Sequence, residues 1–210
     1  MYAKQSEKEN QQLNEPDLGG TYNASDYLSW KVDELMELIR GKIFKMSPSP
    51  QSNHQLLLSE LYSQMVKSRT LKEGCRIWLA PLDVYLVHPG EDWLQAVNIV
   101  EPDLFIVCNP SKINKRGCVG APDFVVEILS PITRKKDATL KKELYEEYGV
   151  REYWMISWQE RMVHINLLNE KGKYETLSPK VEGEVISPRD FPQLNIDLEE
   201  LFKELPEETI

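Results

Sequence analysis

The sequence predicts an α/β domain in which helices flank a mixed β-sheet. Apolar residues recur at helical spacing over residues 52–70, which predicts an amphipathic helix. From Arg76 the pattern changes to short runs rich in β-branched and aromatic residues, separated by Pro, Gly or Asp. A second helical pattern covers residues 134–148, and Gly149 is a suitable C-cap for it. This alternation of strand and helix patterns is typical of the α/β class.

The N-terminal part of the chain is expected to be a polar tail followed by a short helix and a hairpin. Residues 1–22 are rich in Gln, Asn and Glu and end in a glycine pair, which predicts a flexible tail. Ser25-Asp26 is the expected start of the short helix. Two apolar runs flank Arg40-Gly41, which suits a two-residue hairpin turn, and a helix over residues 26–39 is the alternative.

The remaining elements follow in order from local patterns. The expected strands are Met36–Ile39, Lys42–Met46, Arg76–Leu79, Leu82–Val87, Ala96–Val100, Leu104–Cys108, Phe124–Leu129, Tyr153–Ser157, Met162–Leu168, Lys173–Thr176 and Val185–Ile186. A Gly/Pro/Lys-rich loop is expected over residues 109–120, and a short acidic helix over residues 198–205. These elements make one domain over residues 23–205, with a second tail at residues 206–210.

Composition excludes several classes of protein. The chain has 210 residues with 25 basic and 34 acidic side chains, so its net charge is −9. That charge argues against a protein that coats nucleic acid by bulk attraction. No stretch approaches the ~18 apolar residues of a membrane helix, and no secretory signal is visible. Three cysteines without a C-x-x-C pair predict reduced thiols, and we expect a cytoplasmic location.

The middle of the chain is locally basic. Residues 109–142 contain eight Lys or Arg and three Asp or Glu, a local charge of +5. Such a zone can attract a polyanion even within an acidic protein, because exposed charges act over about 8 Å. The alternative is a solvated loop and helix face.

Two carboxylates on predicted strands are candidates for chemistry. Asp103 opens one strand, and Glu127 lies inside an apolar run where burial requires a hydrogen bond, an ion partner or a metal. Lys141 lies on the following helix. Two converging carboxylates suit Mg²⁺ or Mn²⁺, and a nearby lysine can orient water or neutralise charge that develops on a phosphate. The alternatives are a turn role for Asp103 and an ion pair between Glu127 and Lys141.

Three segments together resemble a known family. They are residues 101–108 (EPDLFIVC), residues 120–131 (GAPDFVVEILSP) and residues 137–154, which include Asp137, Lys141 and GVREYW. This pattern resembles the uncharacterised bacterial restriction-endonuclease-like family of the PD-(D/E)XK nuclease superfamily, over roughly residues 25–205. The resemblance implies a restriction-endonuclease-like mixed sheet flanked by helices, with an additional N-terminal hairpin and C-terminal strands. It also implies a metal-dependent site that cleaves phosphodiester bonds.

The resemblance assigns roles to individual residues. Asp103 matches the first acid of the motif and Glu127 the second, and Ile128 would complete the metal shell with its carbonyl. Leu129 stands where the motif has lysine, and Lys141 is the matching position on the next helix. Four further residues are candidates for the cleft: Glu37 as an extra metal ligand, His54 as a phosphate contact or proton carrier, Asp123, and Lys142, which points about 100° away from Lys141 around the helix.

The leading hypothesis is therefore an endonuclease that uses Mg²⁺ or Mn²⁺ to hydrolyse phosphodiester bonds in DNA. Its expected backbone contacts are Lys112, Lys115, Arg116, Arg134 and Lys135, and a homodimer would allow both strands to be cut. The main alternative is a non-catalytic nucleic-acid-binding or interaction protein on the same fold, which the Leu129 departure and the negative charge favour. A weaker alternative is a paired-carboxylate hydrolase that acts on sugars.

Overall fold

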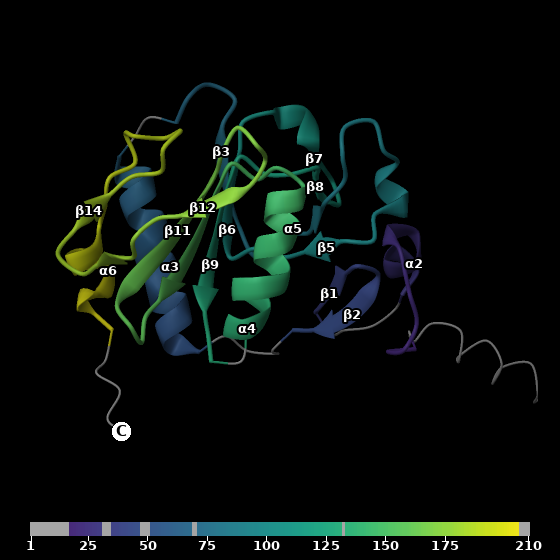
Figure 1. Ribbon diagram of the computed structural model, residues 1–210, viewed down its shortest axis with the longest axis horizontal. Coiled ribbons are helices and arrows are strands. Elements are labelled where there is room, and N and C mark those ends of the chain that lie inside the picture. The colour runs from purple at the N-terminus through teal and green to yellow at the C-terminus, as the bar shows by residue number, and fades with distance from the viewer. Residues whose placement is uncertain (1–16, 31–34, 47–50, 69–70, 132, 206–210) are drawn as a thin grey trace, which may run out of the picture.

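The computed structural model describes residues 17–30, 35–46, 51–68, 71–131 and 133–205. Two β-sheets lie side by side in it, and helices cover both faces of the larger sheet (Figure 1). This confirms the predicted α/β class with a mixed sheet flanked by helices. Residues 1–16 of the predicted tail over residues 1–22, and the predicted tail at residues 206–210, lie outside the described residues.

The larger sheet has the strand order β12-β11-β10-β9-β6-β3, and β13 also pairs with β11. Its strands are β3 (Arg76–Leu79), β6 (Leu104–Val107), β9 (Phe124–Leu129), β10 (Glu152–Ser157), β11 (Met162–Leu168), β12 (Tyr174–Thr176) and β13 (Lys180–Val181). The central strands β9 and β10 are parallel, and the helical segment between them makes the crossover. Every residue of β9 is buried, which explains its continuous apolar run.

The second sheet has the order β2-β1-β5-β4-β8-β7. Its strands are β1 (Met36–Ile39), β2 (Lys42–Lys45), β4 (Val84–Tyr85), β5 (Ile99–Val100), β7 (Ile113–Asn114) and β8 (Gly117–Val119). Arg40 and Gly41 both have positive φ, at 52° and 73°, as a type I′ turn requires, so the hairpin is confirmed over the alternative helix. Lys42 donates to the carbonyls of Gly19 and Gly20, so part of the predicted tail is anchored to this hairpin.

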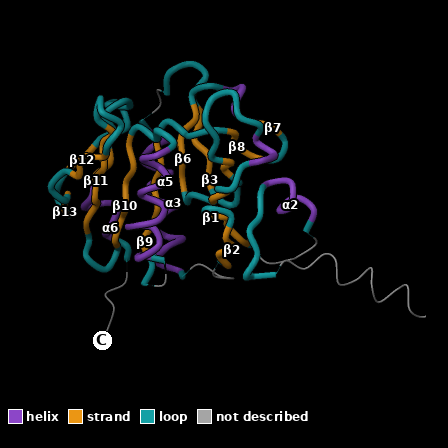
Figure 2. The backbone as a smooth tube through the Cα atoms, turned by 45° about the vertical axis from the view of Figure 1, so that its right-hand side comes forward, coloured by secondary structure: helices purple, strands orange, loops and turns teal. Residues whose placement is uncertain are grey.

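Helices pack on both faces of the larger sheet (Figure 2). The helices are α2 (Ala24–Ser29), α3 (Ser52–Lys67), α4 (Arg134–Lys136), the π-helical turn η4 (Asp137–Lys141), α5 (Lys142–Glu147) and α6 (Leu198–Lys203), with 3₁₀ turns η2 (Trp93–Gln95) and η3 (Pro110–Lys112) and a small strand pair β14 (Val185–Ile186) and β15 (Ile196–Asp197). Apolar residues of α3 and α6 share one core with the even-numbered residues of β6 and β9. The odd-numbered residues of these strands share the other core with α5. Asp103 and Glu127 therefore belong to the face covered by α5.

The structure corrects two expectations. The predicted loop at residues 109–120 contains η3, β7 and β8, because the segment returns to pair in parallel with β4. Cys75 and Cys108 form a disulfide, whereas we predicted reduced thiols. The physical reason is the antiparallel register of β3 and β6, which pairs Arg76 with Val107 and so places the two cysteines opposite each other. Cys118 is free and buried, and burial raises the pKa of its thiol to about 12.

Candidate active site

Asp103 and Glu127 lie across from each other on neighbouring strands. Leu104 of β6 pairs with Val126 of β9, and continuing this antiparallel register by one residue brings the two carboxylates together. Asp103 accepts a hydrogen bond from the Ile128 peptide N–H at 2.6 Å through Oδ2, and its Oδ1 lies 3.0 Å from His54 Nε2. The pairing of β6 with β9 thus builds the centre of the site.

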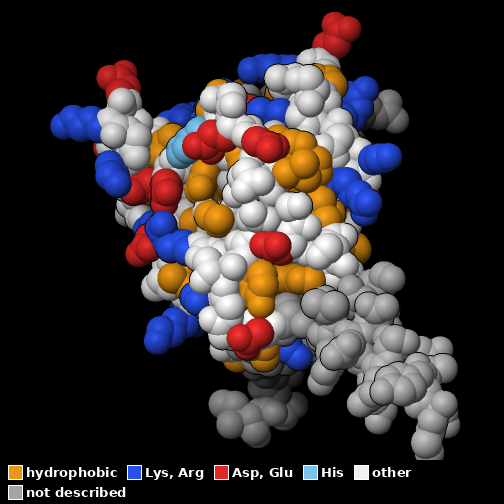
Figure 3. Space-filling view, turned by 90° about the vertical axis from the view of Figure 1, so that its right-hand side faces the viewer, with side chains coloured by type: hydrophobic (Ala, Val, Ile, Leu, Met, Phe, Trp, Pro, Cys, Tyr) orange, Lys and Arg blue, Asp and Glu red, His pale blue; other side chains and the backbone are white. Residues whose placement is uncertain are grey.

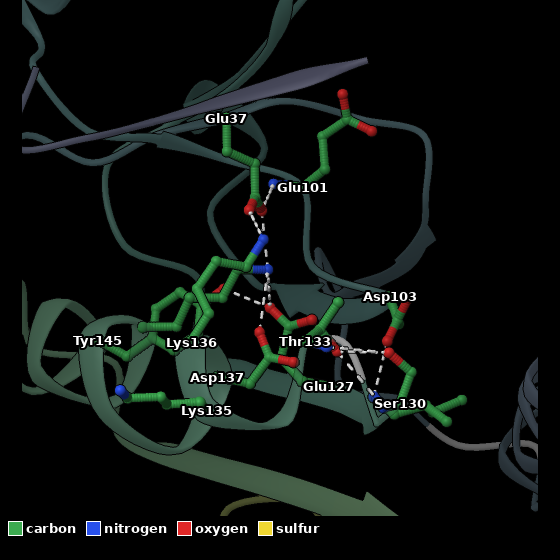
Figure 4. A network of polar contacts seen from close by, with 12 residues as sticks. Glu37, Glu101, Asp103, Glu127, Ser130, Thr133, Lys135, Lys136, Asp137 and Tyr145 are labelled. Atoms are coloured by element: carbon green, nitrogen blue, oxygen red, sulfur yellow. Dashed lines mark hydrogen bonds and ion pairs between the residues drawn. The ribbon is translucent and has the colours of Figure 1, made fainter. Parts of the chain in front are cut away.

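Lys141 pairs with three buried carboxylates. Figure 4 shows these carboxylates, Glu37, Glu127 and Asp137, within one network of polar contacts. The Nζ atom of Lys141 is 2.7 Å from Oε1 of Glu127, 2.7 Å from Oε1 of Glu37 and 3.8 Å from Oδ1 of Asp137. The Tyr145 hydroxyl donates to Oε1 of Glu127 at 2.8 Å. The structure therefore brings the three residues of the predicted motif, Asp103, Glu127 and Lys141, to one place.

Leu129 explains why the lysine comes from a helix. Its side chain is only 5% exposed and lies in the apolar core beneath α5. A lysine at position 129 would have to place its charge in that core. Lys141 instead reaches Glu127 from the helix above the sheet.

The π-helical turn places two lysines on the same carboxylate. Lys136 pairs with Oε2 of Glu37, while Lys141 pairs with Oε1. Residues five apart lie about 140° from each other around an α-helix, whereas the wider π-turn brings them to the same side. Helical spacing alone could not identify Lys136 as part of the site, since its only sequence signal is its position in a run of basic residues.

Burial and charge shift the pKa values of this network in opposite directions. Burial is the largest effect on Glu127, and the charges of Asp137, Asp103 and Glu37 add to it, so the pKa of Glu127 rises well above its ordinary value despite Lys141. Burial would lower the pKa of Lys141, but its carboxylate neighbours raise it well above normal. Burial would raise the pKa of Glu37, but Lys141 and Lys136 together lower it. Lys141 is therefore protonated and Glu37 ionised at neutral pH.

The network forms the floor of a cavity of about 670 Å³. The charged residues that line it are Lys45, Glu101, Asp103, Glu127, Lys136, Asp137 and Lys141. With Glu37, which lies against Lys141, this makes five carboxylates and three lysines. The floor therefore has an excess of two negative charges when all these groups are ionised, which a divalent cation would balance.

The residues present fit Mg²⁺ or Mn²⁺ with water ligands. Among the described residues, no group of three or more His, Cys, Asp or Glu side chains is arranged to hold a metal ion, so a closed zinc site is not formed there. Mg²⁺ needs only one or two carboxylates and retains several waters. Asp103 and Glu127 supply these carboxylates. The Ile128 N–H donates to Asp103. The N–H and C=O of one strand residue point to the same side of the strand, so the carbonyl oxygen of Ile128 also points toward the strand that follows Asp103.

The structure places the other candidate cleft residues in different surroundings. Both oxygens of Glu37 accept from lysines, and its role as an extra metal ligand stays a prediction. His54 lines the cavity and contacts Asp103, as a cleft residue should. Asp123 lies at the opposite end of β9, where it accepts from the Cys108 N–H and pairs with Arg151. Lys142 points away and donates to Thr176.

The predicted backbone contacts do not form one surface. Three of them, Lys112, Lys115 and Arg116, lie around β7 and β8, whereas Arg134 and Lys135 lie on α4 at the other end of the molecule (Figure 1). Lys112 donates to the Ala121 carbonyl, and Arg134 pairs with Glu160. On the side of the molecule that carries the second sheet and α2, basic and acidic side chains are interspersed (Figure 3).

Sequence reasoning also missed Glu101, which lines the cavity floor. It is 6% exposed, and its Oε2 atom is buried without a hydrogen-bond partner among the described residues. Burial, together with the charges of Asp83 and Glu37, raises its pKa to about 7. The sequence signal that could have identified Glu101 as a site residue was its position directly before the Pro102-Asp103 pair.

The model of the Uma2 family, described as "Putative restriction endonuclease", matches residues 24–199. The chain belongs to the Uma2 family. The Uma2 fold is also seen in the crystal structure of a "putative nuclease belonging to DUF820" from Anabaena variabilis ATCC 29413, with a TM-score of 0.66 and 21% identity over 87% of this chain and 98% of that chain. No curated protein matches this chain. Among the described residues, no helix is long and apolar enough to span a membrane.

Proposed function

We propose that this Uma2 family member is a divalent-metal-dependent endonuclease that hydrolyses phosphodiester bonds in DNA. The observation that carries the proposal is the convergence of Asp103, Glu127 and Lys141 on the floor of one cavity. The description of the family, "Putative restriction endonuclease", supports a nucleic acid as the substrate.

The side chains at the cavity floor have separate roles in this proposal. Asp103 and Glu127 would hold Mg²⁺ or Mn²⁺, which when bound lowers the pKa of a water and neutralises phosphate charge. Lys141 keeps its proton because three carboxylates surround it, so its Nζ can donate to a phosphate oxygen as charge develops there. Tyr145 and Lys141 both donate to Oε1 of Glu127 and fix the orientation of that carboxylate. His54 orients Asp103 in the same way from the other side.

Cleavage of DNA by matched variants tests this proposal. Purified protein is incubated with supercoiled plasmid and with labelled oligonucleotides in Mn²⁺, in Mg²⁺ and in EDTA. Wild type and Asp123→Asn should cleave in the presence of metal, whereas Asp103→Asn should lose at least 100-fold in rate. Asp123 is the matched control because it is a strand-start aspartate outside the cavity. Equal rates for the two variants, or cleavage in EDTA, would overturn the proposal.

A further inference from the structure

The wall of the cavity beside the charged floor is formed by one face of α3. The residues on this face are His54, Gln55, Leu58, Ser59 and Tyr62, and the N-cap residue Gln51 lines the cavity just before them. The helical residues recur at the spacing of a single helical face. Together with Gln51, the face carries two amides, an imidazole, a hydroxyl, a phenol ring and an apolar side chain, but no carboxylate. A protein with a net charge of −9 therefore presents a hydrogen-bonding wall without acidic side chains directly beside its candidate active site.

The helix fixes the distances along this wall. His54, in the first turn of α3, contacts Asp103 at 3.0 Å, so the N-terminal end of the wall lies at the candidate metal site. Leu58 and Tyr62 follow on the same face, about 6 Å and 12 Å farther along the axis at 1.5 Å per residue. The wall thus continues away from the cleavage point over the length of an extended nucleotide or two.

The chemistry of the cavity lining suits unpaired bases. Tyr62 is 39% exposed and lines the cavity, and Phe44 and Lys45 of β2 line it too. Aromatic rings stack on bases of any sequence, and amides such as Gln55 hydrogen-bond to base edges. Lys45 and Lys136 line the same cavity, and Lys136 pairs there with Glu37.

The same geometry disfavours an intact duplex. A helix reads duplex DNA by protruding into the major groove. Here α3 packs its other face on the sheet and forms the wall of a concave cavity. A volume of about 670 Å³ lies in the range of pockets that enclose a small molecule, a size that suits individual nucleotides.

We propose that the cavity face of α3 is a binding site for unpaired nucleotides, so that the substrate is single-stranded or locally unpaired nucleic acid. This inference rests on the proposed function and specifies its substrate class. Tyr62 stacks on a base one or two nucleotides from the scissile phosphate, and the amides of Gln51 and Gln55 contact base edges.

Binding without turnover tests the inference separately from catalysis. Fluorescence anisotropy is measured with a labelled 12-nucleotide single strand and with its duplex, at one salt concentration, with Ca²⁺ in place of Mn²⁺. The variants are Tyr62→Ala, Tyr62→Phe and Leu56→Ala. Leu56 is the matched control because it is also 39% exposed on α3 but does not line the cavity. Circular dichroism verifies that each variant is folded. We expect folded variants because Tyr62 and Leu56 are both exposed.

We expect the single strand to bind at least tenfold more tightly than the duplex. Tyr62→Ala should weaken single-strand binding fivefold or more, whereas Tyr62→Phe and Leu56→Ala should stay within twofold of wild type. Equal affinity for duplex and single strand, an unchanged Tyr62→Ala, or no binding of either DNA would overturn the inference. Tyr62-dependent binding without cleavage in Mn²⁺ would instead overturn the proposed nuclease activity and leave the binding site standing.

Discussion

Lys141 of the π-turn and Glu37 of β1 form a buried ion pair, with Nζ 2.7 Å from Oε1 and side chains 3% and 0% exposed. The lysine belongs to the helix above the larger sheet, and the glutamate belongs to the hairpin of the second sheet. Glu37 also accepts from the Glu101 backbone N–H at 3.0 Å. The hairpin therefore holds the candidate catalytic lysine in place, and the two sheets form one site.

Truncation of Glu37 should be strongly destabilising. Glu37→Ala leaves Lys136 and Lys141 without a shared partner, and losing one member of a buried pair typically costs about 3–5 kcal/mol. Guanidinium unfolding followed by circular dichroism measures this loss. The control is Glu147→Ala, which removes an exposed pair with Arg40 and should cost less than about 1 kcal/mol. Equal costs for the two variants would show that the buried pair does not support the fold.

Glu101 should make the metal-free protein less stable as pH rises. Asp83 and Glu37 face it with negative charge and Lys141 with positive charge, and burial is the largest cause of its raised pKa of about 7. Because the pKa of Glu101 is raised in the folded state, its contribution to folding stability is fully present below about pH 4.5. This contribution is lost as the pH rises through about 7. Glu101→Gln should therefore be more stable than wild type by about 1–2 kcal/mol at pH 8 and equal to it near pH 4.5. Unfolding curves in EDTA at both pH values check this, and a lower stability of the variant at pH 8 would refute it.

Two adjacent lysines provide a matched pair for catalysis. Lys141→Ala removes the ammonium group beside Glu127, and we expect at least a 100-fold loss of cleavage rate. Lys142→Ala removes the same charge from the chain but disturbs only a contact with Thr176, so its rate should stay within about twofold of wild type. Single-turnover cleavage of a labelled single strand measures both rates under conditions where each variant is folded. Similar rates for both variants would exclude a specific role for Lys141.

The disulfide should be measurable by thiol counting and by stability. Denatured protein should show one reactive thiol, Cys118, before reduction and three after it. Cys75 and Cys108 are 33 residues apart, so reduction should cost about 2–4 kcal/mol by releasing that loop in the unfolded chain. Thiol titration in guanidinium and thermal unfolding with and without dithiothreitol provide the two readouts. Three thiols before reduction would contradict the bond.

Sequence patterns predicted those elements whose conformation is determined by their own residues. The positive-φ turn at Arg40-Gly41, the buried run of β9 and the glycine cap at Gly149, with φ of 82°, all follow from their own residues. The second sheet does not, because β4 and β8 pair in parallel through contacts between distant segments of only two or three residues each. The disulfide depends on the register of β3 and β6, and this register cannot be inferred from the spacing of the cysteines in the sequence.

The same distinction applies to the site. Asp103 and Glu127 could be predicted because strand parity and an apolar run around a carboxylate are visible in the sequence. The pairing of Glu37 with Lys136 could not, because it depends on a π-turn and on how the two sheets meet. The sequence also gave no reason to divide the basic residues between opposite ends of the molecule, as the fold does.

The most direct test of the central claim is a Mn²⁺ titration followed by electron paramagnetic resonance. Asp103 and Glu127 should hold Mn²⁺ in wild-type protein, and Asp123→Asn should bind it equally well. Asp103→Asn and Glu127→Gln should each weaken binding at least tenfold, since each removes one of the two carboxylate ligands. Mn²⁺ affinity that is the same in all four proteins, or undetectable in wild type, would contradict a metal site on these two strands.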